Sequence, residues 1–334
     1  MAGGGGFTPT DWIWRNGKMV RWEDATLHVL SHVVHYGSSI FEGIRCYDTP
    51  DGPAIFRLHE HMRRFFDSAR IYRMDLEQSS EELEAACDQV VAANALDECY
   101  LRPIALRGYG SPGVNPLNSP IEVFVLCWGW GAYLGDKGMT HGVDACISSW
   151  NRMEPNTFPS FAKAGGNYLS AGLMKMEAIK NGYDEAIALG PSGMISEGSG
   201  QNICMIRDGV LLTPQLDGTF LPGITRDAVI RLARAAGIEV REQPLAREMV
   251  YIADELFFTG TAAEITPIKS VDRITVGDGK VGPITKMIQD KLLGIARGKY
   301  DDEFGWRHAV KTKGATNTAQ RVKRNDYTAT TTAG

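Results

Sequence analysis

The sequence predicts an α/β protein of two domains, with sheets of the α+β type and packed helices. The chain has 334 residues, which is more than a single hydrophobic core usually serves. Helix-like and strand-like segments alternate along both halves. The glycine-rich segment WGWGAYLGDKG, residues 128–138, reads as a connection between them. We therefore expect a smaller domain at 1–129, an interdomain loop at 130–142 and a larger domain at 143–310.

The first half is expected to begin with a hairpin. WIWRNGKMVRW places Asn16 and Gly17, a preferred two-residue turn, between aromatic flanks. A later helix is opened by a capping box of Ser79 and Glu82. The predicted elements of this half are the hairpin 12–22, helices 58–74 and 79–96, and strands 100–110 and 121–131.

The second half combines short strands with three predicted helices. Asn167 is the expected N-cap of the first of these helices. The second has Thr225 at its cap, Asp227 in its first turn and Gly237 as its terminator. The predicted helices are 167–182, 222–237 and 281–298, and the predicted strands are 144–150, 184–190, 194–206, 210–214 and 254–268.

The composition argues against several classes of protein. A net charge of −5 with dispersed Lys and Arg residues argues against a nucleic-acid partner. No apolar run has the length of a membrane span, and the N-terminus lacks the pattern of a signal peptide. Six cysteines without CxxC spacing argue against zinc and dithiol motifs and favour buried, free thiols in the cytoplasm. The threonine-rich segment 311–334 cannot build a core, so we expect a disordered tail.

Several motifs fail on inspection. The GxGxxG at 108–113 is followed by two prolines, so it lacks the helix that a dinucleotide site needs. Ser199 is not part of a GxSxG, because Glu197 stands where the first glycine should be. Four histidines have close spacing without a third ligand, so we predict no metal site and expect packed or surface side chains: His32, His35, His59 and His61.

One lysine has unusual neighbours. In FAKAGGNYLS, Lys163 lies among alanines and glycines, which leaves room for something bulky over its side chain. Thr225 at a helix start and the tight turn TGTAA at 259–263 both favour an anion such as phosphate, and Glu197 adds a carboxylate. Each signal alone is weak. Together, a lysine nucleophile, a phosphate site and a carboxylate meet the needs of pyridoxal 5′-phosphate (PLP).

The chain also resembles a known family. Seven segments occur in the order and spacing of the bacterial branched-chain amino acid aminotransferases of PLP fold type IV, and the likeness runs from about residue 12 to residue 309. These segments are HYGSSIFEGIRCY, LHEHMRRFFDSARIYRM, AYLG, KAGGNYLS, GMISEGSGQN, LPGITRDAVI and FFTGTAAEITPI. The resemblance implies two α/β domains with PLP in the cleft between them.

The resemblance also implies roles at the cofactor. Lys163 would be the catalytic lysine that binds PLP as a Schiff base, Glu197 would pair with the pyridine nitrogen, and Tyr168 would hydrogen-bond the ring hydroxyl. The residues implied for the phosphate are Arg64, the backbone of Ile224, Thr225 and Thr261. Arg63 is a neighbouring alternative to Arg64, which the helix register of the family motif favours. Gln201 departs from the family, because many relatives have glutamate there.

For the substrate, the family implies that its α-carboxylate lies at the turn Thr261–Ala262 with help from Tyr100. Arg102 would meet the distal carboxylate of glutamate, although a purely structural role for this arginine is a serious alternative. The residues implied around the aliphatic side chain are Phe41, Trp130 and Tyr133, with Tyr36 and the Gly113–Val114 loop of a partner subunit. From sequence alone, the aromatic residues among them could equally be core.

The implied function is a ping-pong transamination. Leucine, isoleucine or valine would give its amino group through PLP to 2-oxoglutarate, which leaves as glutamate. The alternatives are a D-amino acid transaminase, an aminodeoxychorismate lyase, or a non-catalytic PLP-binding relative. Retention of Lys163, Glu197 and Thr225 argues against the last, and YLRPIA at 100–105 favours the branched-chain group. The family implies a homodimer or homohexamer, and the sequence does not rank the three amino acids or the direction of the pathway.

Overall fold

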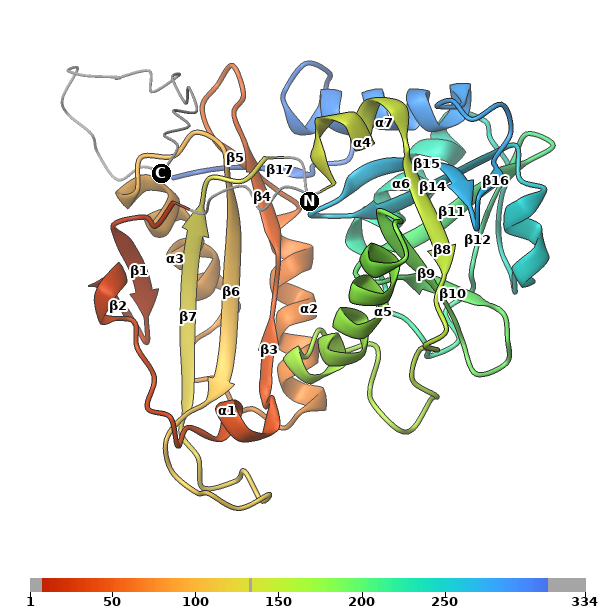
Figure 1. The fold of residues 1–334 in the computed structure, drawn as a ribbon. Coiled ribbons are helices and arrows are strands. Elements are labelled where there is room, and N and C mark those ends of the chain that lie inside the picture. The colour runs from red at the N-terminus through yellow and green to blue at the C-terminus, as the bar shows by residue number, and fades with distance from the viewer. Residues whose placement is uncertain (1–7, 132–133, 312–334) are drawn as a thin grey trace, which may run out of the picture.

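The protein folds into two domains, each built on one β-sheet, in a computed structural model that describes residues 8–131 and 134–311 (Figure 1). The strands of the first sheet are β1 (Trp12–Arg15), β2 (Lys18–Arg21), β3 (Ser39–Phe41), β4 (Ile44–Tyr47), β5 (Ala54–Phe56), β6 (Cys99–Arg107), β7 (Ile121–Trp128) and β17 (Arg307–Ala309). Their order is β17-β5-β4-β6-β7-β1-β2, and β3 pairs with β6 beside this path. The pairs are antiparallel.

The second sheet is mixed. Its strands are β8 (Val143–Ile147), β9 (Glu185–Leu189), β10 (Ile195–Gly198), β11 (Asn202–Arg207), β12 (Val210–Thr213), β13 (Val240–Glu242), β14 (Glu255–Gly260), β15 (Glu264–Val271) and β16 (Ile274–Thr275). Their order is β10-β9-β8-β15-β14-β11-β12-β13, with β16 paired to β15. Strand β8 runs parallel to both β9 and β15, and β12 runs parallel to β13. The fold is thus the two-domain α/β arrangement that the sequence predicts.

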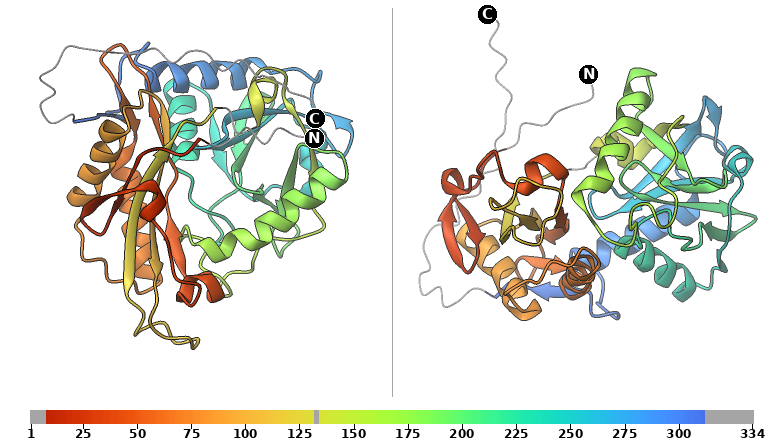
Figure 2. Two further views of the ribbon diagram at one scale, coloured as in Figure 1. Left: turned by 60° about the vertical axis from the view of Figure 1, so that its left-hand side comes forward. Right: turned by 90° about the horizontal axis from the view of Figure 1, so that it is seen from below.

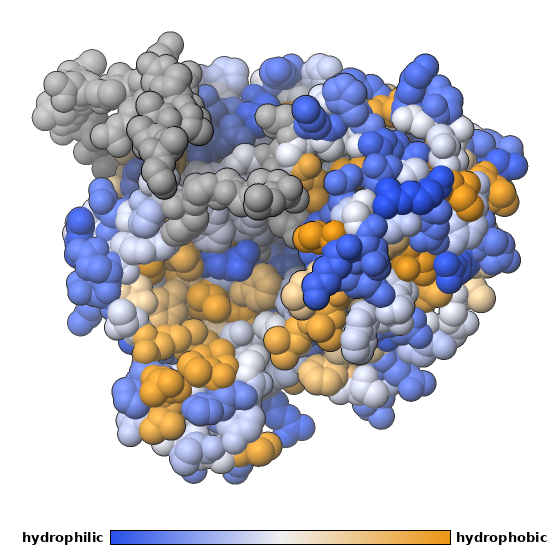
Figure 3. Space-filling model, viewed as in Figure 1, coloured by the Kyte–Doolittle hydropathy of each residue, from blue (hydrophilic) through white to orange (hydrophobic). Residues whose placement is uncertain are grey.

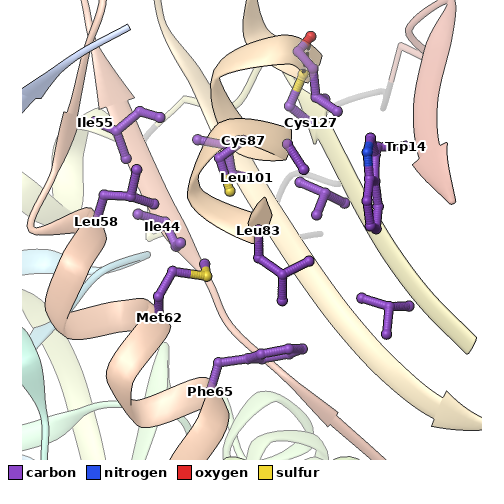
Figure 4. Packing of buried hydrophobic residues seen from close by; sticks show 14 of the residues in the cluster. Trp14, Ile44, Ile55, Leu58, Met62, Phe65, Leu83, Cys87, Leu101 and Cys127 are labelled. Carbon is purple, nitrogen blue, oxygen red and sulfur yellow. Dashed lines mark hydrogen bonds between the residues drawn. The ribbon is translucent and has the colours of Figure 1, made fainter. Parts of the chain in front are cut away.

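Helices cover these sheets and form the cores with them. The helices are α1 (His32–Tyr36), α2 (Leu58–Ile71), α3 (Ser80–Ala93), α4 (Gly135–His141), α5 (Tyr168–Lys180), α6 (Ile224–Ala235) and α7 (Pro283–Ala296). Helices α2 and α3 lie on one face of the first sheet (Figures 1 and 2). Met62 and Phe65 of α2 and Leu83 of α3 point toward Ile44 and Leu101 of the strands, and all five side chains are fully buried (Figure 4). The apolar residues that recur at helical spacing along α2 therefore form the face that packs against the sheet.

A second core joins the two domains. It lies between α6, α7 and the second sheet, but it also includes Tyr47, Phe56 and Trp306 from the first domain and the chain that returns to it. The rings of Phe56 and Trp306 meet edge to face at 5.6 Å. Because Arg307–Ala309 pairs with β5, the last strand of the described residues lies in the first sheet. Shared apolar packing therefore fixes one domain against the other.

Two local predictions are confirmed in detail. The hairpin turns at Asn16 and Gly17, both with positive φ (46° and 89°), as a two-residue turn between right-twisted strands requires. The capping box is also present: the Ser79 hydroxyl accepts from the Glu82 N–H, and the Glu82 carboxylate accepts from the Ser79 N–H.

One predicted helix cap is confirmed in position and one is wrong. Asn167 is the N-cap residue of α5, but its side chain makes no capping hydrogen bond and its amide donates to the carbonyls of Pro159 and Ala162. A short 3₁₀ turn precedes the helix. Thr225 is not the cap of α6, because the N-cap is Gly223 and Thr225 is the second helical residue.

Other outcomes complete the comparison with the sequence. The strands β3, β4, β5 and β17 were not predicted, and α4 occupies part of the expected loop 130–142. The segment after 108 continues as a loop to β7 without a helix, as expected, and all six cysteines are buried free thiols.

Within residues 8–131 and 134–311, none of the helices has the length and apolar character that a membrane crossing needs. Residues 312–334 of the predicted tail lie outside the described residues.

Candidate active site

Lys163 lies where the two domains meet. Its carbonyl accepts a hydrogen bond from the Phe41 N–H of β3 at 2.9 Å, and its own N–H donates to the Ser68 hydroxyl of α2 at 3.0 Å. The side chain is partly exposed and faces a cavity that both domains line. The ammonium or amine donates to the Tyr168 hydroxyl at 2.6 Å. The alanines beside Lys163 are buried, so the segment packs closely against the first domain while its one long side chain turns into the cavity.

The surroundings adjust the acidity of this pair. Burial, with the nearby positive charge of Arg64, lowers the pKa of Lys163 from 10.5 to about 8. Burial, with the negative charge of Glu197, raises the pKa of Tyr168 above its ordinary value. Near neutral pH the phenol therefore keeps its proton, and a useful fraction of Lys163 is the uncharged amine. An uncharged amine is the form of lysine that acts as a nucleophile or base.

A buried carboxylate lines the same cavity. Glu197 of β10 is 5% exposed and forms an ion pair with Arg152 at 2.9 Å and a hydrogen bond from the Asn202 amide at 3.1 Å. Burial raises the pKa of Glu197 to about 7, against the opposing effect of Arg152. Sequence analysis missed Arg152, which lies in none of the quoted motifs, and gave no role to Asn202, although Asn202 ends the segment GMISEGSGQN that contains Glu197. The carboxylate is thus held in place by a cation while it remains able to interact with a further positive group.

The N-terminus of α6 forms the anion site of the cavity. Ile224 and Thr225 lie in the first helical turn, whose N–H groups have no intrahelical partner, and the N-cap side chain is absent at Gly223. A side chain at position 223 would not fit, since its Cβ would stand 1.8 Å from the Asn202 Oδ1. Both the free N–H groups and the helix dipole favour a negative charge here.

Arg64 adds a cation at this end of the cavity. It makes two hydrogen bonds to Glu42, at 2.7 and 2.8 Å, and one to the Pro222 carbonyl at 2.9 Å. Glu42 is fully buried and also contacts His61 Nδ1 at 2.7 Å. Burial would raise the pKa of Glu42, but Arg64 and His61 together hold it well below its usual range. Arg64 lines the cavity, whereas Arg63 is exposed beside it and does not.

His61 is therefore more than a packed side chain. It lies buried on α2 while His59 is exposed, as their spacing predicts, but it belongs to the charged group around Glu42. Sequence analysis did not assign a role to Glu42 or His61. The only sequence signal was the pair Glu42–Gly43 within FEGIRCY, and this pair does not show which cation binds the Glu42 carboxylate.

Thr261, Ala262 and Tyr100 also line the cavity. Gly43 lets the phenol approach the backbone, because a Cβ there would stand 1.8 Å from the Tyr100 oxygen. The ring of Trp130 contacts Tyr100 with a centroid distance of 4.4 Å. The structure thus brings the expected carboxylate turn and Tyr100 to the cavity, with Trp130 in contact with Tyr100.

The guanidinium of Arg102 lies among three aromatic rings, one of which is that of Tyr100. Its guanidinium is 4.7 Å from the ring centre of Phe41, 5.4 Å from that of Tyr100 and 5.6 Å from that of Trp128. Among the described residues, no carboxylate lies within 4 Å of it, and its buried Nε has no hydrogen-bond partner. Arg102 is therefore a half-buried cation that rests on aromatic rings and retains free donors.

Phe41, Trp130 and Arg102 lie beside Tyr100 or Tyr168 without lining the cavity. Tyr36 and Val114 do not line the cavity of their own chain either. Tyr36 is exposed and donates to the Pro112 carbonyl at 3.0 Å, which ties α1 to the loop 108–120. Val114 in this loop is 77% exposed. Tyr133 lies outside the described residues.

Comparison with known proteins places this site in a family. The family model for amino-transferase class IV matches residues 39–271. The branched-chain-amino-acid aminotransferase of Escherichia coli (strain K12) is 54% identical over 301 residues, which cover 90% of this chain and 97% of that protein. The chain belongs to the branched-chain amino acid aminotransferases of class IV.

Solved structures of this family agree with the fold. The Escherichia coli branched-chain amino acid aminotransferase superposes with a TM-score of 0.89 at 53% identity, covering 91% of this chain and 100% of that one. The T.th. branched-chain amino acid aminotransferase with pyridoxamine 5′-phosphate gives a TM-score of 0.88 at 45% identity, covering 91% and 99%. The T.th. enzyme has also been solved with N-(5′-phosphopyridoxyl)-L-glutamate and with 4-methylvaleric acid. These matches support the two-domain PLP fold type IV.

The family's cofactor is PLP, and the cavity residues fit it. The cavity has an anion site at α6 for a phosphate, the amine of Lys163 for an aldehyde and the Glu197 carboxylate for a pyridine nitrogen. Two buried polar atoms in its wall, Gln201 Nε2 and Thr259 Oγ1, have no partner among the described residues. Buried donors of this kind are costly unless a ligand or water satisfies them, so the wall is suited to a polar ligand.

The lowered pKa of Lys163 leads to a testable pH dependence. Capture of PLP by the apoprotein needs the uncharged amine, so its rate should rise with pH and level off above about 8. A short lysine peptide with the ordinary pKa of 10.5, followed by absorbance in the same buffers, corrects for the titration of PLP itself. A capture rate that climbs in parallel with the peptide up to a pH of about 10 would show that the cavity does not acidify Lys163.

Proposed function

We propose that this protein transfers the amino group of leucine, isoleucine or valine to 2-oxoglutarate by a ping-pong mechanism. The observation that carries the proposal is the position of Lys163, an amine with a pKa of about 8, between a helix N-terminus and the carboxylate of Glu197. The class IV family and 54% identity to the Escherichia coli branched-chain enzyme support this substrate class. The T.th. enzyme has been solved with a phosphopyridoxyl-glutamate and with 4-methylvaleric acid. One of these ligands carries an acidic side chain and the other an aliphatic chain, as the two proposed kinds of substrate do.

Bound PLP supplies an electron sink that stabilises negative charge at the substrate Cα. Lys163 Nζ would take the proton from the substrate Cα and carry it to the cofactor carbon, and its pKa of about 8 suits it to act as base and then as acid near neutral pH. Tyr168 keeps Nζ oriented through the 2.6 Å hydrogen bond. Glu197, fixed by Arg152, would pair with the pyridine nitrogen. Arg64, Ile224, Thr225 and Thr261 would hold the phosphate.

Substrate recognition uses the part of the cavity around the Thr261–Ala262 turn and Tyr100. The Thr261–Ala262 turn and Tyr100 hold the α-carboxylate that all the substrates share. Phe41 and Trp130, together with Tyr133, enclose the aliphatic side chain. Arg102 pairs with the distal carboxylate of glutamate or 2-oxoglutarate and rests on its aromatic neighbours when leucine is bound. A cation that is satisfied in both states lets one pocket accept charged and apolar substrates.

We further propose that each site is completed by a second copy of the chain, in a homodimer or a homohexamer. Three residues of α5, Leu169, Leu173 and Met176, form an apolar stripe at helical spacing, yet they are 77%, 39% and 53% exposed. Figure 3 shows further apolar surface over α1 and the loop 108–120, across the hollow between the domains. Exposed apolar areas of this kind mark association surfaces. They include Tyr36 and Val114, which the family assigns to the neighbouring site.

The location proposed for the enzyme is the cytoplasm. The six buried free thiols suit a reducing compartment. The PLP-dependent reaction with amino acids and 2-oxo acids requires no further partner.

A panel of amino donors tests the substrate class. Purified holoenzyme with 2-oxoglutarate should form glutamate readily from leucine, isoleucine and valine, and only weakly from D-alanine or an aromatic donor. Glutamate formation is measured by chromatography, with the Lys163→Ala variant as the inactive control. Preference for D-alanine would favour a D-amino acid transaminase, and no transfer from any donor would favour a non-catalytic relative.

The dual recognition by Arg102 predicts a selective defect. In Arg102→Met, kcat/KM for 2-oxoglutarate should fall roughly tenfold to a hundredfold, because a charge-assisted hydrogen bond is lost. The half-reaction with leucine, followed by the colour change of the cofactor, should change far less. Arg102→Lys keeps the charge and should fall between the two. Equal losses for both substrates would assign Arg102 a structural role.

The proposed association predicts a mass above that of one chain. Sedimentation velocity of the wild type should give a dimer or a hexamer, and Leu173→Glu should weaken it, since the interface would bury an unpaired charge. Ile274→Glu is the matched control, because Ile274 is also an exposed apolar residue (47%) but lies on the edge strand β16. A monomeric wild type with full activity would contradict the proposal.

A further inference from the structure

We infer that Ser68 of α2 is a positioning residue for Lys163: its hydroxyl fixes the backbone of this lysine to the helix that carries Arg64. The inference rests on the proposed role of Lys163 as the residue that binds the aldehyde of PLP. It adds a side chain of the first domain that is fully buried and does not itself line the cavity.

The Ser68 hydroxyl links two peptide groups that belong to different domains. It donates to the Arg64 carbonyl at 2.8 Å and accepts from the Lys163 N–H at 3.0 Å. Donation to the carbonyl four residues earlier is common for a serine within a helix, and it leaves the lone pairs of the hydroxyl oxygen free to accept. The N–H that Ser68 accepts comes from the second domain, 95 residues later in the chain.

Further backbone contacts around Lys163 are made with the first domain. The Lys163 carbonyl accepts from the Phe41 N–H at 2.9 Å, and Ala164 forms an antiparallel bridge with Ile40 of β3. Ala164 is 2% exposed and belongs to the hydrophobic core of the first domain. The segment around Lys163 therefore packs as an extension of the first sheet, although the chain continues from it into α5 of the second domain.

Both polar backbone groups of Lys163 are thus held by the first domain, and Ser68 is the acceptor for one of them. In the described part of the chain, the Lys163 N–H has no hydrogen bond other than that to Ser68. A buried N–H without an acceptor is costly, so removal of the hydroxyl would force the Lys163 backbone to shift or to admit water. The bond from the Phe41 N–H would remain, but one hydrogen bond constrains the orientation of the residue less than two do.

A second connection joins Lys163 to Arg64. Glu42 follows Phe41 in the chain and makes two hydrogen bonds to the Arg64 guanidinium, at 2.7 and 2.8 Å. Because Arg64 and Ser68 lie one turn apart on α2, the helix holds the cation of the phosphate site and the anchor of the lysine at a fixed separation. One aromatic ring likewise carries both the phosphate group and the aldehyde of PLP. A phosphate bound at Arg64 therefore presents the aldehyde to Nζ only if the Lys163 backbone keeps its place relative to α2.

The test measures Schiff-base formation and phosphate binding separately. In Ser68→Ala, the rate of PLP capture by the apoprotein at saturating PLP, followed by absorbance, should fall roughly tenfold, because Nζ loses its fixed position. The analogue 4-deoxypyridoxine 5′-phosphate has the ring and the phosphate of PLP but a methyl group in place of the aldehyde, so it cannot form the Schiff base. Its Kd should stay close to the wild-type value, since Arg64 and the N-terminus of α6 remain in place.

Ser148→Ala is the matched control. Ser148 is also a buried serine whose hydroxyl accepts from a backbone N–H, that of Trp150 at 3.0 Å, and donates to Glu177, but it does not line the cavity. This variant should lose stability, measured by thermal unfolding, without a change in the capture rate.

Ser68→Cys keeps the size of the side chain with a weaker acceptor, so its capture rate should lie between those of the wild type and Ser68→Ala. It carries the comparison if Ser68→Ala does not fold. A wild-type capture rate in the folded Ser68 variants, or an equal loss in Ser148→Ala, would overturn the inference. So would a Kd for the analogue that rises as much as the capture rate falls, because Ser68 would then support the fold of the whole site.

Borohydride reduction of the wild-type holoenzyme separates two kinds of failure. Reduction fixes the pyridoxyl group on the lysine that binds it, and peptide mapping identifies that residue. If the label lies on another lysine, the proposed role of Lys163 is wrong, and the inference about Ser68 fails with it. If the label lies on Lys163 while Ser68→Ala captures PLP at the wild-type rate, the inference alone fails.

Discussion

The chemistry of this protein depends on an amine that faces a cavity and loses its proton more readily than an ordinary lysine does. Burial and the charge of Arg64 lower the pKa of Lys163 to about 8. The same burial would raise the energy of the other charged side chains that line the cavity, and these have fixed partners. Arg64 is paired with Glu42, and Glu197 is paired with Arg152. The ion pairs around the cavity therefore allow a carboxylate, a cation and a free amine to stay close together.

The two domains divide this task. The second domain supplies Lys163, Glu197 and the helix N-terminus at Ile224, while the first supplies Arg64 and Tyr100. Such a site is accurate only if the domains keep one relative position. The shared core with Phe56 and Trp306 provides that rigidity through apolar packing, and Arg45 adds hydrogen bonds to the carbonyls of Thr261 and Ala262. Preorganisation of this kind lowers the cost of orienting substrate groups.

Substrate recognition makes a further demand, because the pocket must accept a carboxylate in one half-reaction and an aliphatic side chain in the other. In the proposed function, Arg102 would meet it by resting on Phe41, Tyr100 and Trp128 instead of on a fixed carboxylate. A permanent ion pair there would have to be broken for glutamate to bind. Aromatic faces stabilise the cation only modestly, so the guanidinium remains available to a stronger partner.

The sequence by itself determined the elements whose signals are local. The turn at Asn16–Gly17, the capping box at Ser79 and the apolar face of α2 follow from residue type and spacing, and the family motifs assigned Lys163 and Glu197 to the cofactor. Only the tertiary structure decided which residues pair across elements. Arg152 with Glu197 and Glu42 with Arg64 are 45 and 22 residues apart along the chain, and Arg45 is more than 200 residues from the turn that it contacts. The same is true of β17, whose place in the first sheet depends on a partner strand at Ala54–Phe56. Long-range pairing leaves no periodic pattern in the sequence, since it depends on how the two domains pack.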